Sequence, residues 1–233
     1  MTLDQLETEC KSCTKCGLCE GRTNLVFGVG KKDADIMLIG EGPGENEDLQ
    51  GEPFVGRSGK LLDKFLESID LSREKNVYIA NMVKCRPPKN RDPKPEEQEM
   101  CIKWLREQFK IIRPKIIICV GRISAQKLIS PDFKVTKQHG DFIEKNGVLM
   151  MGTYHLLTTH SNIKPKSNII RLTLDFLELL DLASENDDEN NLNAKIACLE
   201  KRNYTPKWDM KPQDIYRTSP NNHTNETINF RLW

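Results

Sequence analysis

Residues 40–62, GEGPGENEDLQGEPFVGRSGKLL, decide how the rest of the chain is interpreted. An apolar run at residues 35–39 precedes this stretch and predicts a buried strand. The apolar spacing that begins at Leu61 predicts a helix after it. A strand that runs into a glycine- and proline-rich loop and then a helix is where open α/β sheets place ligands. A long surface loop is the alternative, and glycines alone do not exclude it.

The loop does not carry the usual signatures of nucleotide binding. It has neither the G-x-G-x-x-G pattern nor the lysine of a phosphate loop. A dinucleotide or triphosphate site is therefore not predicted. Glycines at these positions instead let backbone N–H groups come close to a ligand, because no Cβ is in the way.

Composition limits the class of protein. The chain has 233 residues, of which 37% are hydrophobic and 30% charged, which suits one domain plus an extension. A net charge of +1 argues against nucleic-acid binding through overall charge, although a local basic face stays open. Residues 1–180 carry 28 Lys and Arg against 25 Asp and Glu, whereas residues 181–233 carry 7 against 9. The main body is thus mildly basic.

The chain carries no sign of membrane insertion or export. No apolar run approaches the roughly 18 residues that a membrane helix needs. The N-terminus is charged and lacks the apolar core of a signal peptide. We therefore expect an intracellular protein of the cytoplasm or nucleoid, with no membrane partner.

Strands and helices alternate along the predicted domain. Strands are expected at residues 35–39, 77–81, 115–120 and in a hairpin at 142–145 and 148–151, with a β-like edge segment at 24–30. Helices are expected at residues 1–9, up to about 69, from 95 onward, up to about 129 and at about 167–180. This order predicts an α/β fold with three α/β/α layers and a mostly parallel, four-stranded central sheet.

The composition changes near residue 182. Residues 1–182 are predicted to form the domain, and residues 183–233 to be a polar tail that is disordered or loosely attached. The tail ends in an apolar segment, INFRLW, at residues 228–233. This segment can dock on a protein partner or fold back on the domain, and the sequence leaves both open.

Eight cysteines need an explanation other than disulfide bonds in an intracellular chain. Four of them are spaced three apart near the N-terminus: Cys10, Cys13, Cys16 and Cys19. Two others, Cys85 and Cys101, flank a proline-rich loop and can complete a four-thiolate site. Zinc and iron–sulfur clusters both use four thiolates, so both stay open. Cys119 is predicted to be a buried small hydrophobe, and Cys198 lies in the polar tail.

Four sequence blocks resemble the family 4 uracil-DNA glycosylases. They are CTKCGL at residues 13–18 with GRT and VFG after it, the loop at 40–62, NMVKCRPPKNRDP at 81–93 continuing to Cys101, and Gly121 after the strand at 115–120. The resemblance implies an enzyme of base excision repair that flips uracil out of DNA and hydrolyses its N-glycosidic bond. It leaves an abasic site, and no lysine is placed to form a Schiff base. The expected partner is uracil-containing DNA, and the expected state is a monomer.

The resemblance also implies a [4Fe–4S] cluster near the N-terminus. Its ligands carry over as Cys13, Cys16, Cys85 and Cys101. Cys10 and Cys19 are then surplus, either as solvent-facing thiols or as substitutes for a neighbouring ligand. The implied role of the cluster is structural.

A flipped uracil must be recognised on its Watson–Crick edge and stacked on its face. The Asn81 amide has both a donor and an acceptor, which complement O4 and N3–H of uracil. Phe54 can supply the stacking face. The resemblance adds backbone contacts from Gly40, Glu41, Gly42 and Pro43 of the loop.

Catalytic roles follow from the same resemblance. His155 is expected to donate a hydrogen bond to O2 of uracil as negative charge develops there. Glu41 is expected to orient the attacking water or to stabilise the cation-like sugar. Glu47 is a second candidate for this role.

The chain departs from the family after His155. The family continues with Pro-Ser and a loop that enters DNA, whereas this chain has Leu156 and Leu157. These leucines can form an apolar wedge, and Lys164 or Lys166 can contact phosphates. The DNA contacts are expected to include Arg57 and Arg86 as well. The departure leaves an alternative open, a weak or inactive paralogue that acts as an iron–sulfur DNA-binding or partner-binding protein.

Overall fold

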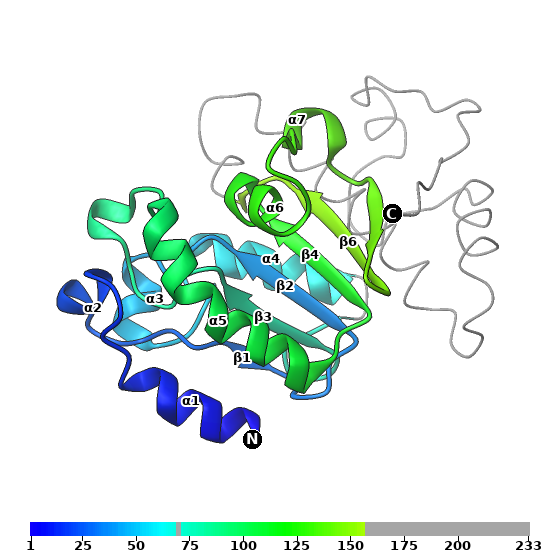
Figure 1. The fold of residues 1–233 in the computed structure, drawn as a ribbon. Helices are drawn as coiled ribbons and strands as arrows, with labels where there is room; N and C mark the ends of the chain where they lie inside the picture. Colours follow the sequence, from blue (N-terminus) through cyan, green and yellow to red (C-terminus); the bar gives the residue numbers. More distant parts are fainter. Residues whose placement is uncertain (69–70, 157–233) are drawn as a thin grey trace, which may run out of the picture.

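A mixed six-stranded sheet forms the centre of the computed structural model, which describes residues 1–68 and 71–156 (Figure 1). Its strand order is β1-β3-β2-β4-β6-β5. The strands are β1 (Val29–Gly30), β2 (Ile36–Gly40), β3 (Val77–Asn81), β4 (Ile116–Val120), β5 (Phe142–Lys145) and β6 (Val148–Thr153). The four central strands are parallel, and β1 and β5 pair antiparallel at the edges. The predicted α/β class is confirmed, whereas the expected four-stranded sheet is corrected to six strands.

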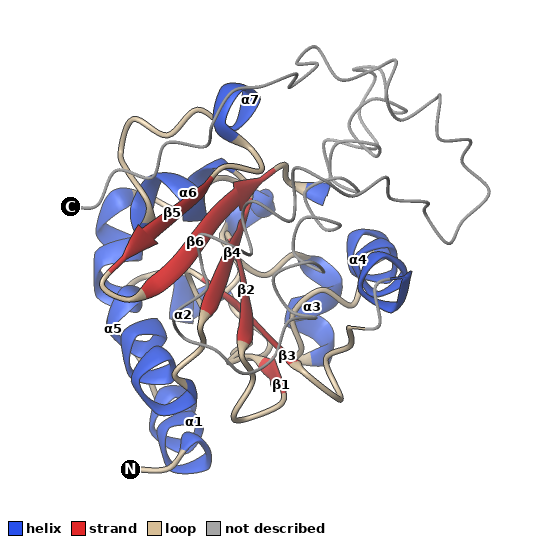
Figure 2. Cartoon of the chain, turned by 90° about the vertical axis from the view of Figure 1, so that its right-hand side faces the viewer, coloured by secondary structure: helices blue, strands red, loops and turns tan. Residues whose placement is uncertain are grey.

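Helices cover both faces of this sheet. They are α1 (Leu3–Lys11), α2 (Leu18–Gly21), α3 (Glu45–Gln50), α4 (Arg57–Ser68), α5 (Pro95–Ile112), α6 (Arg122–Leu128) and α7 (Val135–Gln138). Figures 1 and 2 show α4 on one face, and α1, α5 and α6 on the other. Every residue of β2, β3 and β4 is buried, as expected for parallel strands covered on both sides.

Alternation along the strands divides the core into two halves. On β2, Leu38 packs with Leu62 and Leu66 of α4. Its neighbour Met37 packs instead with Leu105 of α5 and Leu6 of α1. Successive strand side chains point to opposite faces, so one apolar run supplies both layers.

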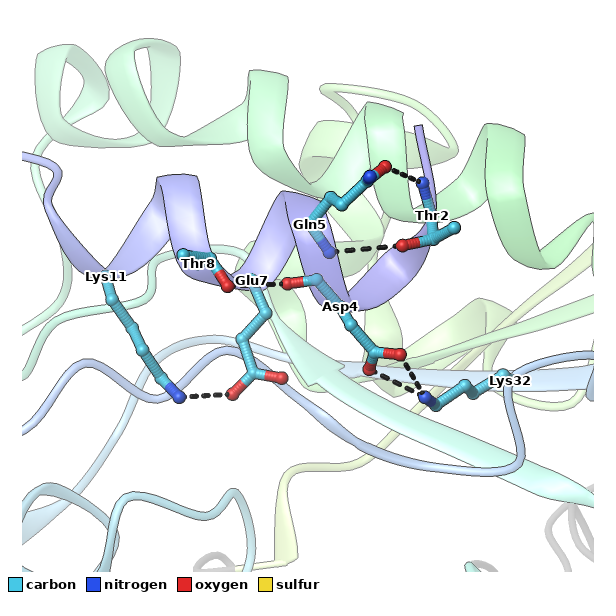
Figure 3. Close-up of polar contacts among 7 residues, drawn as sticks. All are labelled: Thr2, Asp4, Gln5, Glu7, Thr8, Lys11 and Lys32. Carbon is cyan, nitrogen blue, oxygen red and sulfur yellow. Dashed lines mark hydrogen bonds and ion pairs between the residues drawn. The ribbon is translucent and has the colours of Figure 1, made fainter.

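Polar contacts fix the first turn of helix α1 (Figure 3). The Thr2 hydroxyl accepts a hydrogen bond from the Gln5 backbone (3.3 Å), and the Gln5 side chain accepts one from the Thr2 backbone (2.8 Å), which forms a capping box. Lys32 pairs with Asp4 at 2.6 Å on the exposed side. The helix thereby lies against α5 and leads the chain to the first cysteines.

The hairpin prediction is confirmed. Asn146 and Gly147 have positive φ values of 55° and 77°, which suit the tight turn between β5 and β6. Other elements differ from the prediction, and the short helices α2 and α7 were not expected. The edge segment is a strand only at Val29–Gly30, and the loop contains α3, whose acidic sequence lacks an apolar period.

Some predicted elements lie outside the described residues. These are the helix at about 167–180, the tail at 183–233 and its apolar end at 228–233. Within the described ranges, no helix is both long enough and apolar enough to cross a membrane.

The turn before α4 holds Phe54 in a left-handed backbone conformation, with φ at 54°. Arg73 stabilises it, because its guanidinium donates to the carbonyls of Pro53 and Phe54 at 3.0 Å each. The same guanidinium pairs with Asp63 at 2.6 Å. Gly59 on α4 crosses directly over this turn, and a Cβ at Gly59 would overlap the Phe54 carbonyl oxygen.

We predict that Gly59→Ala lowers the free energy of unfolding by roughly 2–4 kcal/mol, because the helix and the turn cannot both keep their positions. Urea unfolding followed by circular dichroism measures the change. The control is Gly21→Ala, where an added Cβ meets no atom within 4 Å and the change should stay within about 0.5 kcal/mol. Equal stability of the two variants would contradict the close contact between Gly59 of α4 and the turn at Phe54.

Candidate active site and metal centre

The carboxyl ends of the four parallel strands bring separate segments to one edge of the sheet. Gly40 at the end of β2 pairs in register with Asn81 at the end of β3. On the other side of β2, Val120 of β4 pairs with Thr153 of β6, two residues before His155. This edge is where open α/β sheets bind ligands. We call Gly40, Glu41, Phe54, Asn81 and His155 the strand-end site.

Gly40 is the point at which Asn81 and Phe54 meet. A Cβ at Gly40 would overlap the Asn81 Oδ1 and would lie 2.7 Å from Cζ of the Phe54 ring. Both side chains are buried, with exposed fractions of 2% for Asn81 and 8% for Phe54. The Asn81 amide makes no hydrogen bond to any residue in the described ranges. A glycine at this position therefore allows an amide and an aromatic ring to converge.

The loop backbone offers fewer donors than expected. Beyond the strand, the Gly40 and Glu41 carbonyls accept hydrogen bonds from Met82 (3.0 Å) and Val83 (3.2 Å). The Gly44 N–H donates to the Glu47 carboxylate at 3.1 Å, and Pro43 has no N–H. Only the N–H groups before Pro43 are thus candidates to contact a ligand.

Glu47 holds the loop rather than facing an open site. One carboxylate oxygen accepts hydrogen bonds from the Val55 and Gly56 backbones, each at 3.0 Å. The other accepts the Gly44 bond. Three backbone donors therefore occupy this carboxylate, and the loop closes around it just before α4.

Glu41 and His155 share an electrostatic neighbour, Asp92 of the proline-rich loop. Burial raises the pKa of Glu41 to about 7, with Asp92 adding to the rise and Arg122 opposing it. Burial lowers the pKa of His155, and Asp92 opposes that shift. Asp92 itself pairs with Arg122 at 2.6 Å. Near pH 7, the neutral form of His155 is therefore favoured, and Glu41 is present in both its protonated and its ionised form.

Gly121 makes room for the imidazole. It has a φ of 105°, and an added Cβ would lie 3.0 Å from Cδ2 of His155. A side chain there would be strained and would also crowd the ring. The Gly121 N–H donates to the Thr153 carbonyl at 2.9 Å, which ties the two strand ends together.

The expected DNA contacts are only partly within the described residues. Arg57 is exposed at the start of α4, and Arg86 is half-buried with its Nε donating to Asn90 at 2.8 Å. Leu157 and Lys164 lie outside the described ranges. The prediction for Leu156 is wrong, because its side chain is fully buried in the core on the α4 side and cannot form an exposed wedge.

A separate cavity collects the cysteines, and we call it the cysteine cavity. It encloses about 280 Å³ of empty space, part of which is open to solvent. Its lining residues are Cys13, Lys15, Cys16, Cys19, Leu25, Lys84, Cys85, Met100, Cys101 and Trp104. The four expected ligands thus face one cavity, together with Cys19. In the part of the chain that the structure describes, no three Cys, His, Asp or Glu side chains close around a single metal ion.

Each of the four expected ligands accepts an N–H hydrogen bond. Trp104 Nε1 donates to the Cys13 sulfur at 3.4 Å, Arg22 to Cys85 at 3.2 Å, and the Lys84 backbone to Cys101 at 3.2 Å. Cys16 accepts a hydrogen bond from the Leu18 backbone, which lowers its pKa against the rise caused by burial. N–H donors stabilise negative charge on sulfur, so these four residues suit thiolate ligands.

The surplus cysteines differ from one another. Cys10 is fully buried, which excludes a solvent-facing thiol, and burial raises its pKa to about 12. Cys19 is half-buried in the cavity wall. Cys119 is buried within β4, as predicted, and burial raises its pKa. Cys198 lies outside the described ranges.

The loop between Cys85 and Cys101 is fixed by one carboxylate. Arg91 donates to both oxygens of Glu97, at 2.8 and 2.6 Å, and the Lys94 backbone donates to the same group at 2.7 Å. The Arg91 hydrogen bond is the main reason that the pKa of Glu97 is lowered. The start of α5, and with it Cys101, is therefore held in place.

Two residues that sequence reasoning missed connect the cysteine cavity to the strand-end loop. The Arg22 guanidinium donates to the backbone carbonyls of Cys13 (2.8 Å) and Lys11 (3.0 Å) besides its bond to Cys85. Asp48 on α3 is buried, and its carboxylate accepts hydrogen bonds from the Thr23 backbone at 2.9 and 3.0 Å. The burial of Asp48 depends on tertiary contacts with Thr23, so the sequence did not predict it.

Comparison with known proteins identifies the family of this chain. The family model described as the uracil DNA glycosylase superfamily matches residues 27–170. The chain is 54% identical over 125 residues to the type-4 uracil-DNA glycosylase of Archaeoglobus fulgidus, which covers 54% of this chain and 62% of the relative. This alignment therefore spans less than two thirds of that relative's length.

Two further relatives are covered more completely. The type-4 uracil-DNA glycosylase of Saccharolobus solfataricus is 45% identical over 162 residues, which are 66% of this chain and 74% of the relative. The type-4 uracil-DNA glycosylase of Thermotoga maritima is 44% identical over 157 residues, which are 65% of this chain and 81% of the relative.

Proposed function

Because the chain belongs to the uracil DNA glycosylase superfamily, we propose that it removes uracil from DNA by hydrolysing the N-glycosidic bond. The resemblance to the type-4 members is confirmed by relatives that are 44% and 45% identical. These relatives favour the enzyme over the alternative of a non-catalytic DNA-binding or partner-binding protein. The expected substrate is DNA that contains uracil, and the product is an abasic site.

The convergence of Asn81 and Phe54 at Gly40 carries the proposal. A pocket for a flipped base needs polar groups that face the edge of the base and an apolar surface that packs against its face. An amide beside an aromatic ring can supply both. The Asn81 amide is buried and has no partner among the described residues, so a ligand would satisfy it. Uracil presents O4 and N3–H, which pair with the amide donor and acceptor.

Catalysis would then depend on His155 and Glu41. When the bond to the sugar breaks, negative charge develops on uracil and positive charge on the sugar. A neutral imidazole donates a hydrogen bond to uracil O2, and buried donors stabilise such charge strongly. The ionised Glu41 carboxylate can orient water for attack on the sugar and stabilise its positive charge. We assign Glu47 to holding the loop, since three backbone N–H groups occupy it.

We further propose that the cysteine cavity holds a [4Fe–4S] cluster on Cys13, Cys16, Cys85 and Cys101. The support is the N–H donor at each of these sulfurs and the wall that all four share. When bound, such a cluster would link the N-terminal segment to the loop before α5. Its role here is structural, since hydrolysis needs no electron transfer.

The remaining proposals concern binding and organisation. Residues 1–182 form the glycosylase domain and act as a monomer. Arg57 and Arg86 contact DNA, Lys164 from the segment after His155 contacts phosphates, and Leu157 acts as an apolar wedge. The apolar end of the tail either binds a protein partner or folds back on the domain.

We predict that the purified protein, incubated with a uracil-containing oligonucleotide, produces strand breaks only after alkali treatment. The same oligonucleotide with thymine in place of uracil is the control and should stay intact. Asn81→Ala should lower the excision rate by on the order of 100-fold, because two hydrogen bonds to the base are lost. No breaks at an excess of enzyme would reject the enzyme proposal. An unchanged rate in Asn81→Ala would reject the assigned contact.

The excision rate should rise between pH 6 and pH 8. Because the pKa of Glu41 is about 7, the carboxyl group is protonated at the lower pH and can neither orient water nor stabilise a cation. Burial lowers the pKa of His155, which favours its neutral form. Single-turnover rates measure the profile, and Glu41→Gln should lower the rate by on the order of 100-fold or more and flatten it. A flat profile in the unchanged protein would contradict this role.

The purified protein should be brown and contain four iron atoms per cluster. Cys85→Ser should lose the visible absorbance and the iron, because it removes a ligand. Cys19→Ser tests a cysteine of the same cavity that is not an expected ligand, and it should keep both. A colourless protein with one bound zinc would reject the cluster, and loss of iron in Cys19→Ser would reject the ligand set.

A further inference from the structure

Lys84 is a lysine with an exposed fraction of 0%, among the largest fully buried side chains of the described residues. None of the ion pairs in the described ranges includes it. Burying an ammonium group costs several kcal/mol unless opposite charge and hydrogen bonds compensate. The position of Lys84 therefore needs an anion that the protein's carboxylates do not supply.

Among the described residues, the hydrogen-bond partners of the Lys84 ammonium are neutral groups. It donates to the Asn81 backbone carbonyl at 3.0 Å and to the Gln108 side-chain oxygen at 2.7 Å. It also lies 5.9 Å from the centroid of the Phe27 ring. These partners satisfy its hydrogen bonds without balancing its charge.

Gln108 is oriented so that its oxygen must face Lys84. Its amide nitrogen donates to the Phe27 carbonyl at 3.0 Å and to the Tyr78 hydroxyl at 3.2 Å. Gln108 is fully buried as well. The amide cannot reverse without losing these bonds, so the site is built to receive a donor.

The other side of Lys84 forms part of the cysteine cavity. Its backbone N–H donates to the Cys101 sulfur at 3.2 Å, and the residue lines the cavity beside Cys85. Four thiolates around an iron–sulfur cluster bring net negative charge into this cavity. The charge of the buried Lys84 ammonium interacts favourably with negative charge on Cys101, so it has the sign needed to balance the charge of a cluster.

We propose that Lys84 is a positioning residue that couples the two sites. Its ammonium balances the charge of the bound cluster, and its hydrogen bond to the Asn81 carbonyl holds the Asn81 amide at the strand-end site. The second half of this inference rests on the proposed function, whereas the first half does not. Lys84 itself does not touch the base, since its side chain is enclosed on the α5 side of the sheet.

The test compares Lys84→Met, which keeps the length and removes the charge, with Lys15→Met. Lys15 is an exposed lysine of the same cavity wall, so its charge is screened by water and it makes no bond to Asn81. Cluster loss is followed by the decay of visible absorbance in a chelator. Lys84→Met should lose the cluster roughly tenfold faster than the unchanged protein, because a charged hydrogen-bonding group is removed. Lys15→Met should lose it at the unchanged rate.

In the cluster-free protein, Lys84→Met should not destabilise the fold, and the melting temperature measures this. Without the cluster the buried ammonium is uncompensated, so Lys84→Met should raise that melting temperature or leave it unchanged. A residue that only fills space would instead lower stability in both forms. If the cluster-free protein does not fold, the decay rates alone decide the proposal. Equal decay in Lys84→Met and the unchanged protein would overturn it.

The link to Asn81 is measured by excision in fully loaded protein. Lys84→Met should lower the excision rate, and the double variant with Asn81→Ala should be no slower than Asn81→Ala alone, because both changes act on one contact. If the losses of excision rate from the two substitutions were additive, the proposed link between Lys84 and Asn81 would be overturned. If the unchanged protein excises no uracil, the proposed function fails, and the decay rates still test the charge balance. Normal excision with unaffected decay would overturn the coupling and leave the function standing.

Discussion

The parallel register of β3, β2, β4 and β6 is the constraint on which the rest of the structure depends. It brings Asn81, Gly40 and Thr153 to one edge, although they are far apart in the sequence. Because side chains alternate between the two faces of a strand, an error of one residue in register would turn every side chain to the opposite face. Continuous apolar packing on both faces prevents such a slip. The chemistry at the edge is therefore placed by the core.

Charged side chains, of which Asp48 is buried and the others are half-buried, bond to the loops where the sheet ends. A loop rich in glycine and proline cannot pair its own backbone, and buried N–H and C=O groups need partners. Glu47 and Asp48 supply acceptors for this backbone, and Arg73 supplies donors to the turn at Phe54. Arg22 does the same for the segment that carries Cys13. Charged side chains thus supply hydrogen-bond partners to the loop backbone that it cannot supply to itself.

The two candidate sites are not independent in this fold. Asp48 connects the cysteine segment to α3, and Lys84 connects the wall of the cysteine cavity to Asn81. Each connection uses one buried polar group: the bond between Thr23 and Asp48 joins residues 25 positions apart, and the bond between Lys84 and Asn81 joins residues three apart. A group in the cysteine cavity can therefore affect the strand-end site without contacting a ligand there.

Some of this structure could be predicted from local patterns. Apolar runs identified β2, β3 and β4, and Asn146-Gly147 identified the hairpin. The roles of Asn81 and His155 came from family resemblance, because a lone amide or imidazole has no pattern of its own. The burial of Lys84 and Leu156 could not be predicted, since it depends on tertiary contacts. From the sequence alone, a lysine near a proline-rich loop is expected to be solvated. Only the structure shows that Gln108 of α5 bonds to it in the core.

The most direct test of the central claim is a crystal structure of the protein with free uracil bound. The account predicts uracil at the carboxyl edge of the sheet, with O4 and N3–H on the Asn81 amide, Phe54 against its face and His155 near O2. Gly40 should lie beside the base with no side chain between them. Uracil bound elsewhere, or at this edge without a contact to Asn81, would contradict the account.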